Sequence, residues 1–203
     1  MRNNEQGRSM IEMLGVLAIV GVLSVGGIAG YSKAMNKFKS NKLIDQITTI
    51  STNVKTIFSG QRTYNGLTLK VAGQVGILPA ETYDATEKDS LGSGEVKHAF
   101  NGDIYLEPTG LNADDDEMAY LLTITGIPRE ACIAALTTDF GVDDTVAVGT
   151  DDGVNDVYTS NASSVSDNIG SPSDTSNPAP FSVINATTAC ASTSDNTVYF
   201  KFK

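Results

Sequence analysis

The most apolar stretch of the chain runs from Met10 to Tyr31, where Glu12 is the single charged residue among 22. A helix needs about 20 apolar residues to cross a bilayer, so this stretch predicts one membrane-spanning helix. A secretory signal ends at a small-residue cleavage site behind its apolar core, and no such end is visible here. The run therefore predicts the first half of a longer helix.

From residue 32 to residue 59 the pattern becomes amphipathic. Apolar positions recur every three or four residues, as on one face of a helix; they are Leu43, Ile47, Ile50, Val54 and Ile57. Polar residues occupy the opposite face, namely Lys42, Asp45, Thr49, Asn53 and Lys55. Together the two halves predict one helix from about Ser9 to Phe58, roughly 75 Å long.

Residues 60–203 are long enough to form a domain with its own core. Their β-formers alternate with polar residues in three segments, which predicts strands at 103–107, 118–124 and 197–202, the last of them central in its sheet. A second helix is expected at 127–140, a short helical turn ended by Pro79 at 75–79, and an exposed loop at 170–180. Shorter apolar pieces occur at 145–148, 157–158 and 181–184. The expected class is α+β, with one long helix followed by a domain of strands and shorter helices.

Charge is divided unevenly between these two parts. Residues 1–59 carry a net charge of +4 and residues 60–203 a net charge of −14, within a total of −10. We call residues 60–203 the head. Its acidic charge argues against nucleic-acid binding by the head itself, because such binding needs clustered Lys and Arg.

No arrangement of residues typical of an enzyme is present, and no cofactor is implied. The chain has one His, no nucleophile motif and no phosphate-binding glycine loop. Oxygen ligands surround a Gly turn at Asp151, Asp152, Asn155 and Asp156, which makes a weak calcium site an alternative to a solvated turn. The EF-hand spacing and its terminal Glu are missing there.

Two residues in front of the apolar run, Gly7 and Arg8, make the chain resemble a type IV prepilin. Prepilins share a short polar leader that ends in Gly, cleavage after that Gly, and Glu at the fifth mature position. Residues 1–7 match the leader, and Glu12 is the fifth residue counted from Arg8. The family usually begins its mature chain with Phe or Met, whereas this chain would begin with Arg8.

The resemblance implies the type IV pilin fold, in which a long N-terminal helical spine packs on the antiparallel sheet of a globular head, and it also implies a pathway. The precursor would lie in the bacterial inner membrane, a prepilin peptidase would cut after Gly7, and Arg8 would be N-methylated. Glu12 would then pair with the new amine of Arg8 on a neighbouring copy, while the pilus assembly machinery builds a homopolymer outside the cell. A carboxylate within a membrane helix costs roughly 2.5–3.5 kcal/mol, which favours such a partner. The alternative is that Glu12 only reaches the membrane interface.

The five glycines of the apolar run include Gly26-x-x-x-Gly30, a spacing that permits close approach of two helices in lipid. Whether these glycines serve helix packing, local unwinding of the helix or neither is left open by the sequence.

Cys132 and Cys190 are the only cysteines. In a head that faces an oxidising compartment they predict one disulfide, which bounds a region at 132–190. A first disulfide cysteine on a helix just behind a central strand resembles type IVb major pilins, although the leader of seven residues is shorter than type IVb leaders usually are.

Several alternatives remain at this stage. Lys residues follow the apolar run more densely than Arg residues precede it, which by the positive-inside rule would favour a cytoplasmic head. The domain could also belong to a pseudopilin of a type II secretion system, to a membrane-anchored ligand-binding module, or to a minor pilin. The preferred interpretation is a major pilin whose filament serves adhesion, aggregation, motility or conjugation.

Overall fold

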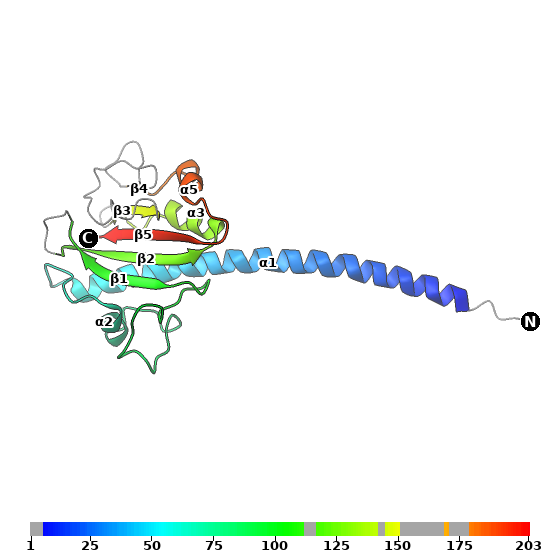
Figure 1. Ribbon diagram of the computed structural model, residues 1–203, viewed down its shortest axis with the longest axis horizontal. Coiled ribbons are helices and arrows are strands. Elements are labelled where there is room, and N and C mark those ends of the chain that lie inside the picture. The colour runs from blue at the N-terminus through cyan, green and yellow to red at the C-terminus, as the bar shows by residue number, and fades with distance from the viewer. Residues whose placement is uncertain (1–5, 112–116, 142–144, 151–168, 171–178) are drawn as a thin grey trace, which may run out of the picture. The chain divides into compact units, whose positions relative to one another are not determined.

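The computed structural model describes residues 6–111, 117–141, 145–150, 169–170 and 179–203. The chain divides into two compact units, Met1–Phe38 and Lys39–Lys203. Helix α1 (Gln6–Phe58) crosses the boundary between them (Figure 1). It begins three residues before the predicted start at Ser9.

The second unit contains one antiparallel sheet of five strands, in the order β1-β2-β5-β3-β4. The strands are β1 (Ile104–Thr109), β2 (Ala119–Ile127), β3 (Thr145–Thr150), β4 (Ile169–Gly170) and β5 (Asn196–Phe202). Strand β5 alternates buried apolar residues with polar ones and lies between β2 and β3, so its predicted central position is confirmed. The expected α+β class is confirmed as well.

The second half of α1 forms the core together with one face of this sheet. Leu43, Ile47, Ile50 and Val54 are at most 1% exposed, and they belong to the same apolar cluster as the inward side chains of β1, β2 and β5. The Tyr120 hydroxyl of β2 also donates to the Ser51 carbonyl oxygen, at 3.4 Å.

Two positions of the predicted helix face differ in the structure. Ile57 is 46% exposed, and Phe58 is buried in its place. Phe58 closes the last turn of α1 against Tyr64, with ring centroids 5.5 Å apart. Tyr64 lies beyond the end of α1. The spacing of apolar residues within the helix therefore could not reveal that Phe58, rather than Ile57, is buried there.

The described part of the second unit also contains the short helices α2 (Leu69–Gln74), α3 (Arg129–Thr137) and α5 (Val183–Ala189). The prediction of a helical turn at 75–79 is wrong, because the Thr68 hydroxyl caps an earlier helix that ends at Gln74. The predicted helix at 127–140 is confirmed but shorter. Helix α5 was not predicted; the Ser182 hydroxyl caps it by accepting from the Asn185 N–H at 3.2 Å.

The segment between α1 and the sheet is attached to α1 by two amide side chains. Gln46, which is 3% exposed, accepts a hydrogen bond from the Ala99 N–H at 3.2 Å. Asn53 donates to the Ile77 carbonyl oxygen at 3.0 Å. This irregular segment is therefore fixed to the helix at two points. The apolar piece at 157–158 and most of the loop at 170–180 lie outside the described residues.

Candidate assembly site

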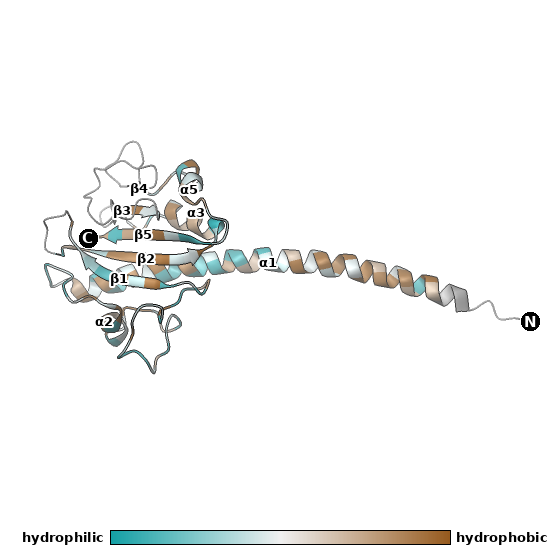
Figure 2. Cartoon of the chain, viewed as in Figure 1, coloured by the Kyte–Doolittle hydropathy of each residue, from teal (hydrophilic) through white to brown (hydrophobic). Residues whose placement is uncertain are grey.

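The first unit presents an apolar surface on every side of α1. Its large apolar side chains from Met10 to Tyr31 are between 51% and 75% exposed, and Figure 2 shows this part of the helix as predominantly hydrophobic. The helix is long and apolar enough to cross a membrane. Such a surface is stable only in lipid or against other protein.

The polar groups of this surface are few, and two of them are already satisfied. The Ser24 hydroxyl donates to the Val20 carbonyl oxygen at 2.7 Å, and the Ser32 hydroxyl donates to the Ile28 carbonyl oxygen at 3.0 Å. These bonds within the helix allow both serines to lie in an apolar medium. Glu12 is exposed in the single chain, so it is the charged group on this surface that calls for a partner.

Glu12 shares one face of α1 with three of the five glycines. Gly15, Gly26 and Gly30 follow it at intervals of 3, 11 and 4 residues, which return to nearly the same side of a helix. Among the described residues, a methyl group built on any of these glycines would meet no atom within 4 Å. The face is therefore open to a second helix, and the carboxylate lies at its N-terminal end.

The sequence places the expected processing site at the start of this helix. The backbone of Gly7 and Arg8 lies within the first turns of α1 in the unprocessed chain. Glu12 follows Arg8 by four residues, about one helical turn.

The predicted cysteine pair is joined in the structure. Cys132 of α3 and Cys190 at the C-terminal end of α5 form a disulfide with a Cα–Cα distance of 6.0 Å, and both residues are fully buried. Arg129 donates to the Thr187 carbonyl oxygen at 3.0 Å, which adds a second link between the two helices. The disulfide therefore fixes α5 to α3, the helix that follows β2.

The proposed calcium ligands Asp151, Asp152, Asn155 and Asp156 lie outside the described residues. Within the part of the chain that the structure does describe, no three His, Cys, Asp or Glu side chains converge as a metal site requires.

His98 is buried and forms a node that sequence reasoning missed. Its Nδ1 accepts from the Phe100 N–H at 3.2 Å, so the neutral ring carries its hydrogen on Nε2, which bonds the Thr125 carbonyl oxygen at 2.7 Å. Burial lowers the pKa of His98 below its usual 6.5, and the charge of Lys97 lowers it further. The hydrogen bond to Thr125 and the charge of Asp103 raise the pKa and so act in the opposite direction. A His between Lys97 and Ala99 gives no signal in the sequence beyond its solitary occurrence.

Comparison with known proteins places these features in a family. The family model described as PilS N terminal matches residues 37–203. The chain is 26% identical over 137 residues to the major structural subunit of the bundle-forming pilus of Escherichia coli O127:H6 (strain E2348/69 / EPEC), and equally to that of Escherichia coli O111:H-. Each match covers 68% of this chain and spans 66% of the relative's length.

Two solved structures share the fold. TcpA, a type IV pilin from Vibrio cholerae El Tor biotype, aligns over 80% of this chain and 98% of its own with a TM-score of 0.53 and 14% identity. A type IVb pilin from Salmonella typhi aligns over 79% and 97% with a TM-score of 0.52 and 14% identity. Since the family model covers most of the chain, the chain belongs to the PilS family, and its fold is that of the type IVb pilins.

Proposed function

We propose that this pilin is the repeating subunit of a type IV pilus filament. The observation that carries the proposal is the exposed apolar surface of α1 from Met10 to Tyr31, which bears the carboxylate of Glu12 and continues into a disulfide-closed head. The name of the Escherichia coli relatives, a major structural subunit, supports the same role. The protein acts as a structural subunit and not as an enzyme.

Each segment of the chain has its own role in this proposal. Residues 1–7 form a leader that a prepilin peptidase removes after Gly7, and Arg8 becomes the N-methylated mature end. Residues 8–31 hold the precursor in the inner membrane and later lie in the filament core. Residues 32–59 attach that segment to the head, residues 60–203, which the extracellular filament displays.

Glu12 is the residue that pairs one copy of the pilin with the next. In lipid its carboxylate costs roughly 2.5–3.5 kcal/mol without a partner. The α-amine of Arg8 on an adjacent copy provides the opposite charge, and cleavage after Gly7 is what creates it. The open face with Gly15, Gly26 and Gly30 lets two such helices approach closely enough for van der Waals contact. The assembly machinery then brings successive copies into this arrangement, and the filament serves adhesion, aggregation, motility or conjugation.

A comparison of carboxylate variants tests this function. Glu12→Ala and Glu12→Gln should still be found in the membrane fraction, but should lower the amount of protein in sheared surface filaments at least about tenfold, since a lost buried charge pair costs several kcal/mol. Asp45→Ala, which removes an exposed carboxylate from the other half of the same helix, is the matched control and should assemble normally.

Wild-type yield from both Glu12 variants would contradict the assembly role. Absence of the unaltered protein from surface filaments would instead favour a pseudopilin or an anchored ligand-binding module.

A further inference from the structure

Two lysines just behind the apolar run have no partner in the described part of the chain. Lys33 and Lys37 are both exposed, and neither forms an ion pair or a hydrogen bond with the residues that the structure describes. They are four residues apart, so they lie on the same side of α1, and we call them the lysine pair. No Asp or Glu occurs between Glu12 and Asp45, so no acidic residue on this stretch of α1 offsets their charge.

The next two lysines of the helix contact the head instead. The Lys39 ammonium lies over the Phe100 ring, 5.7 Å from its centroid. The Lys42 ammonium lies 3.9 Å from the Glu81 carboxylate. Of the four lysines that follow the apolar run, the lysine pair is thus the half that is open to a partner outside the chain.

The position of the lysine pair along α1 matches the headgroup layer of a bilayer. The span from Met10 to Tyr31 rises about 33 Å, close to the hydrocarbon thickness of about 30 Å. Lys33 and Lys37 follow Tyr31 by about 3 and 9 Å along the axis, and a headgroup layer is about 5–8 Å thick. Helical side chains tilt toward the N-terminus, which directs both ammonium groups back to this layer. Tyr31, 67% exposed, lies where aromatic residues collect at membrane interfaces.

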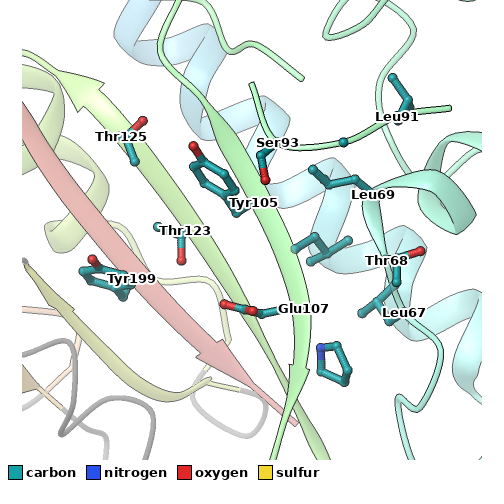
Figure 3. Close-up of a pocket in the computed structure, with 13 residues that line it drawn as sticks. Leu67, Thr68, Leu69, Leu91, Ser93, Tyr105, Glu107, Thr123, Thr125 and Tyr199 are labelled. Atoms are coloured by element: carbon teal, nitrogen blue, oxygen red, sulfur yellow. The ribbon is translucent and has the colours of Figure 1, made fainter. Parts of the chain in front are cut away.

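The charge of the head repels an anionic surface. Residues 60–203 carry a net charge of −14. A groove of about 530 Å³ beside β1 has Tyr105, Thr123 and Tyr199 in one row across its floor (Figure 3). Glu107 is the only charged side chain among the thirteen described residues that line this groove. An anionic ligand is therefore attracted to the lysine pair and not to the groove.

We infer that the lysine pair binds the phosphate groups of anionic phospholipids at the membrane boundary on the head side of the span. Continuity with the apolar run and the opposite charges of ammonium and phosphate both favour lipid as the partner. The inference rests on the membrane-held precursor of the proposed function. It gives a role to lysines that the positive-inside rule leaves unexplained.

Lipid contact at this boundary also sets the depth of the other end of the span. Glu12 precedes Lys33 by 21 residues, a rise of about 32 Å. This rise is close to the hydrocarbon thickness of about 30 Å. The lysine pair therefore holds Glu12 and the Gly7 cleavage site at the opposite boundary.

The test measures which lipid collects at the lysine pair in the full chain. Ala34→Cys places a thiol at an exposed position beside the pair, and the native cysteines are joined to each other, so bimane labels this site alone. The labelled chain is reconstituted in phosphatidylcholine vesicles that contain a small fraction of spin-labelled phosphatidylglycerol or of spin-labelled phosphatidylcholine. Both probes carry the nitroxide at the same acyl carbon near the headgroup, so quenching of bimane reports their local concentration.

Phosphatidylglycerol should quench the label at least about threefold more strongly than phosphatidylcholine in about 0.15 M salt. The reason is that each lysine near an anionic headgroup favours the charged lipid about fivefold. In about 1 M salt the ratio should fall below about 1.5, because the screening length shortens to about 3 Å.

Three double variants in the labelled chain assign the contact. Lys33→Gln with Lys37→Gln should bring the quenching ratio close to one, whereas Lys33→Arg with Lys37→Arg keeps both charges and should retain it. Lys39→Gln with Lys42→Gln is the matched control, since it removes the same charge from the same helix. These two lysines follow Tyr31 by at least about 12 Å, more than the Debye length of about 8 Å, so the ratio should change by less than about 1.5-fold.

Equal quenching by the two lipids in the wild type, or an equal fall of the ratio in the two glutamine double variants, would overturn the inference. Equal quenching together with loss of surface filaments in Lys33→Gln with Lys37→Gln would assign the lysine pair to a neighbouring copy instead. The vesicle measurement requires no assembly, so its failure leaves the Glu12 test and the proposed subunit role untouched. Absence of the unaltered protein from surface filaments would count against that role and not against lipid contact.

Discussion

Removal of the Cys132–Cys190 disulfide should destabilise the head by an amount that the loop length sets. The two cysteines are 58 residues apart, and closing a loop of that size removes conformational entropy from the unfolded chain worth about 4 kcal/mol at 25 °C. The loop contains β3, β4 and α5. After reduction these elements remain attached through other contacts, such as the Phe181 N–H bond to the Leu136 carbonyl oxygen at 2.9 Å.

The expected loss for Cys132→Ala together with Cys190→Ala is therefore about 3–5 kcal/mol in the free energy of unfolding of the head. Urea denaturation of the full chain in detergent micelles measures it, followed by tyrosine fluorescence because the chain has seven Tyr and no Trp. With a denaturant slope of about 2 kcal/mol per molar, the midpoint should fall by roughly 2 M.

A comparison of the stability losses of the single, double and control variants tests the loop-entropy reasoning more sharply than the double variant alone. Either single variant opens the loop, so each should lose nearly as much stability as the double variant, and the reduced wild type should match them. Thr188→Ala, an exposed change on α5, should alter the free energy of unfolding by less than about 0.5 kcal/mol. A double-variant loss below about 1.5 kcal/mol, or single losses that add up to the double, would refute the loop-entropy reasoning.

Three further predictions concern the packing of the second unit. Ile47→Ala should cost about 2–5 kcal/mol because its side chain is fully buried, whereas Ile57→Ala, at a position 46% exposed, should cost less than about 1.5 kcal/mol in the same urea assay; equal costs would contradict the observed helix face. Gly102→Ala should destabilise the head by more than about 2 kcal/mol, since a Cβ there would lie 2.0 Å from a backbone oxygen, while Gly92→Ala, whose nearest contact is at 3.7 Å, should be tolerated; thermal melts of both variants decide this. Because burial lowers the pKa of His98, the unfolded chain binds a proton first as the pH falls, so stability present above pH 6.5 should decline below that value. His98→Gln should lose that decline between pH 6.5 and 5 in urea midpoints, and an unchanged slope would show that another group is responsible.

The features that the sequence predicted well are those set by long periodic patterns. The apolar face of α1 extends over several turns, so Leu43, Ile47, Ile50 and Val54 could be assigned from spacing alone. The alternation in Asn196–Phe202 likewise marked a central strand. Cys132 and Cys190 had no other partner available within the chain.

The features that the sequence did not reveal depend on tertiary contacts. Helices α2 and α5 have six and seven residues, too few to form without packing, so their weak local signals were overlooked. The buried role of Gln46 depends on the chain near Ala99, which lies 53 residues away. The row of Tyr105, Thr123 and Tyr199 depends on the strand register, which three separate segments determine together. The partner that we propose for Glu12 lies on another copy, which a single chain does not contain.

The central claim is that this chain is processed after Gly7 and assembled outside the cell, and one measurement tests it directly. Filaments sheared from the cell surface are denatured, and the intact mass of the pilin within them is determined. We expect a chain that begins at Arg8, heavier by one methyl group and lighter by two hydrogens for the disulfide. A full-length chain that remains in the membrane and is missing from the sheared fraction would contradict the account.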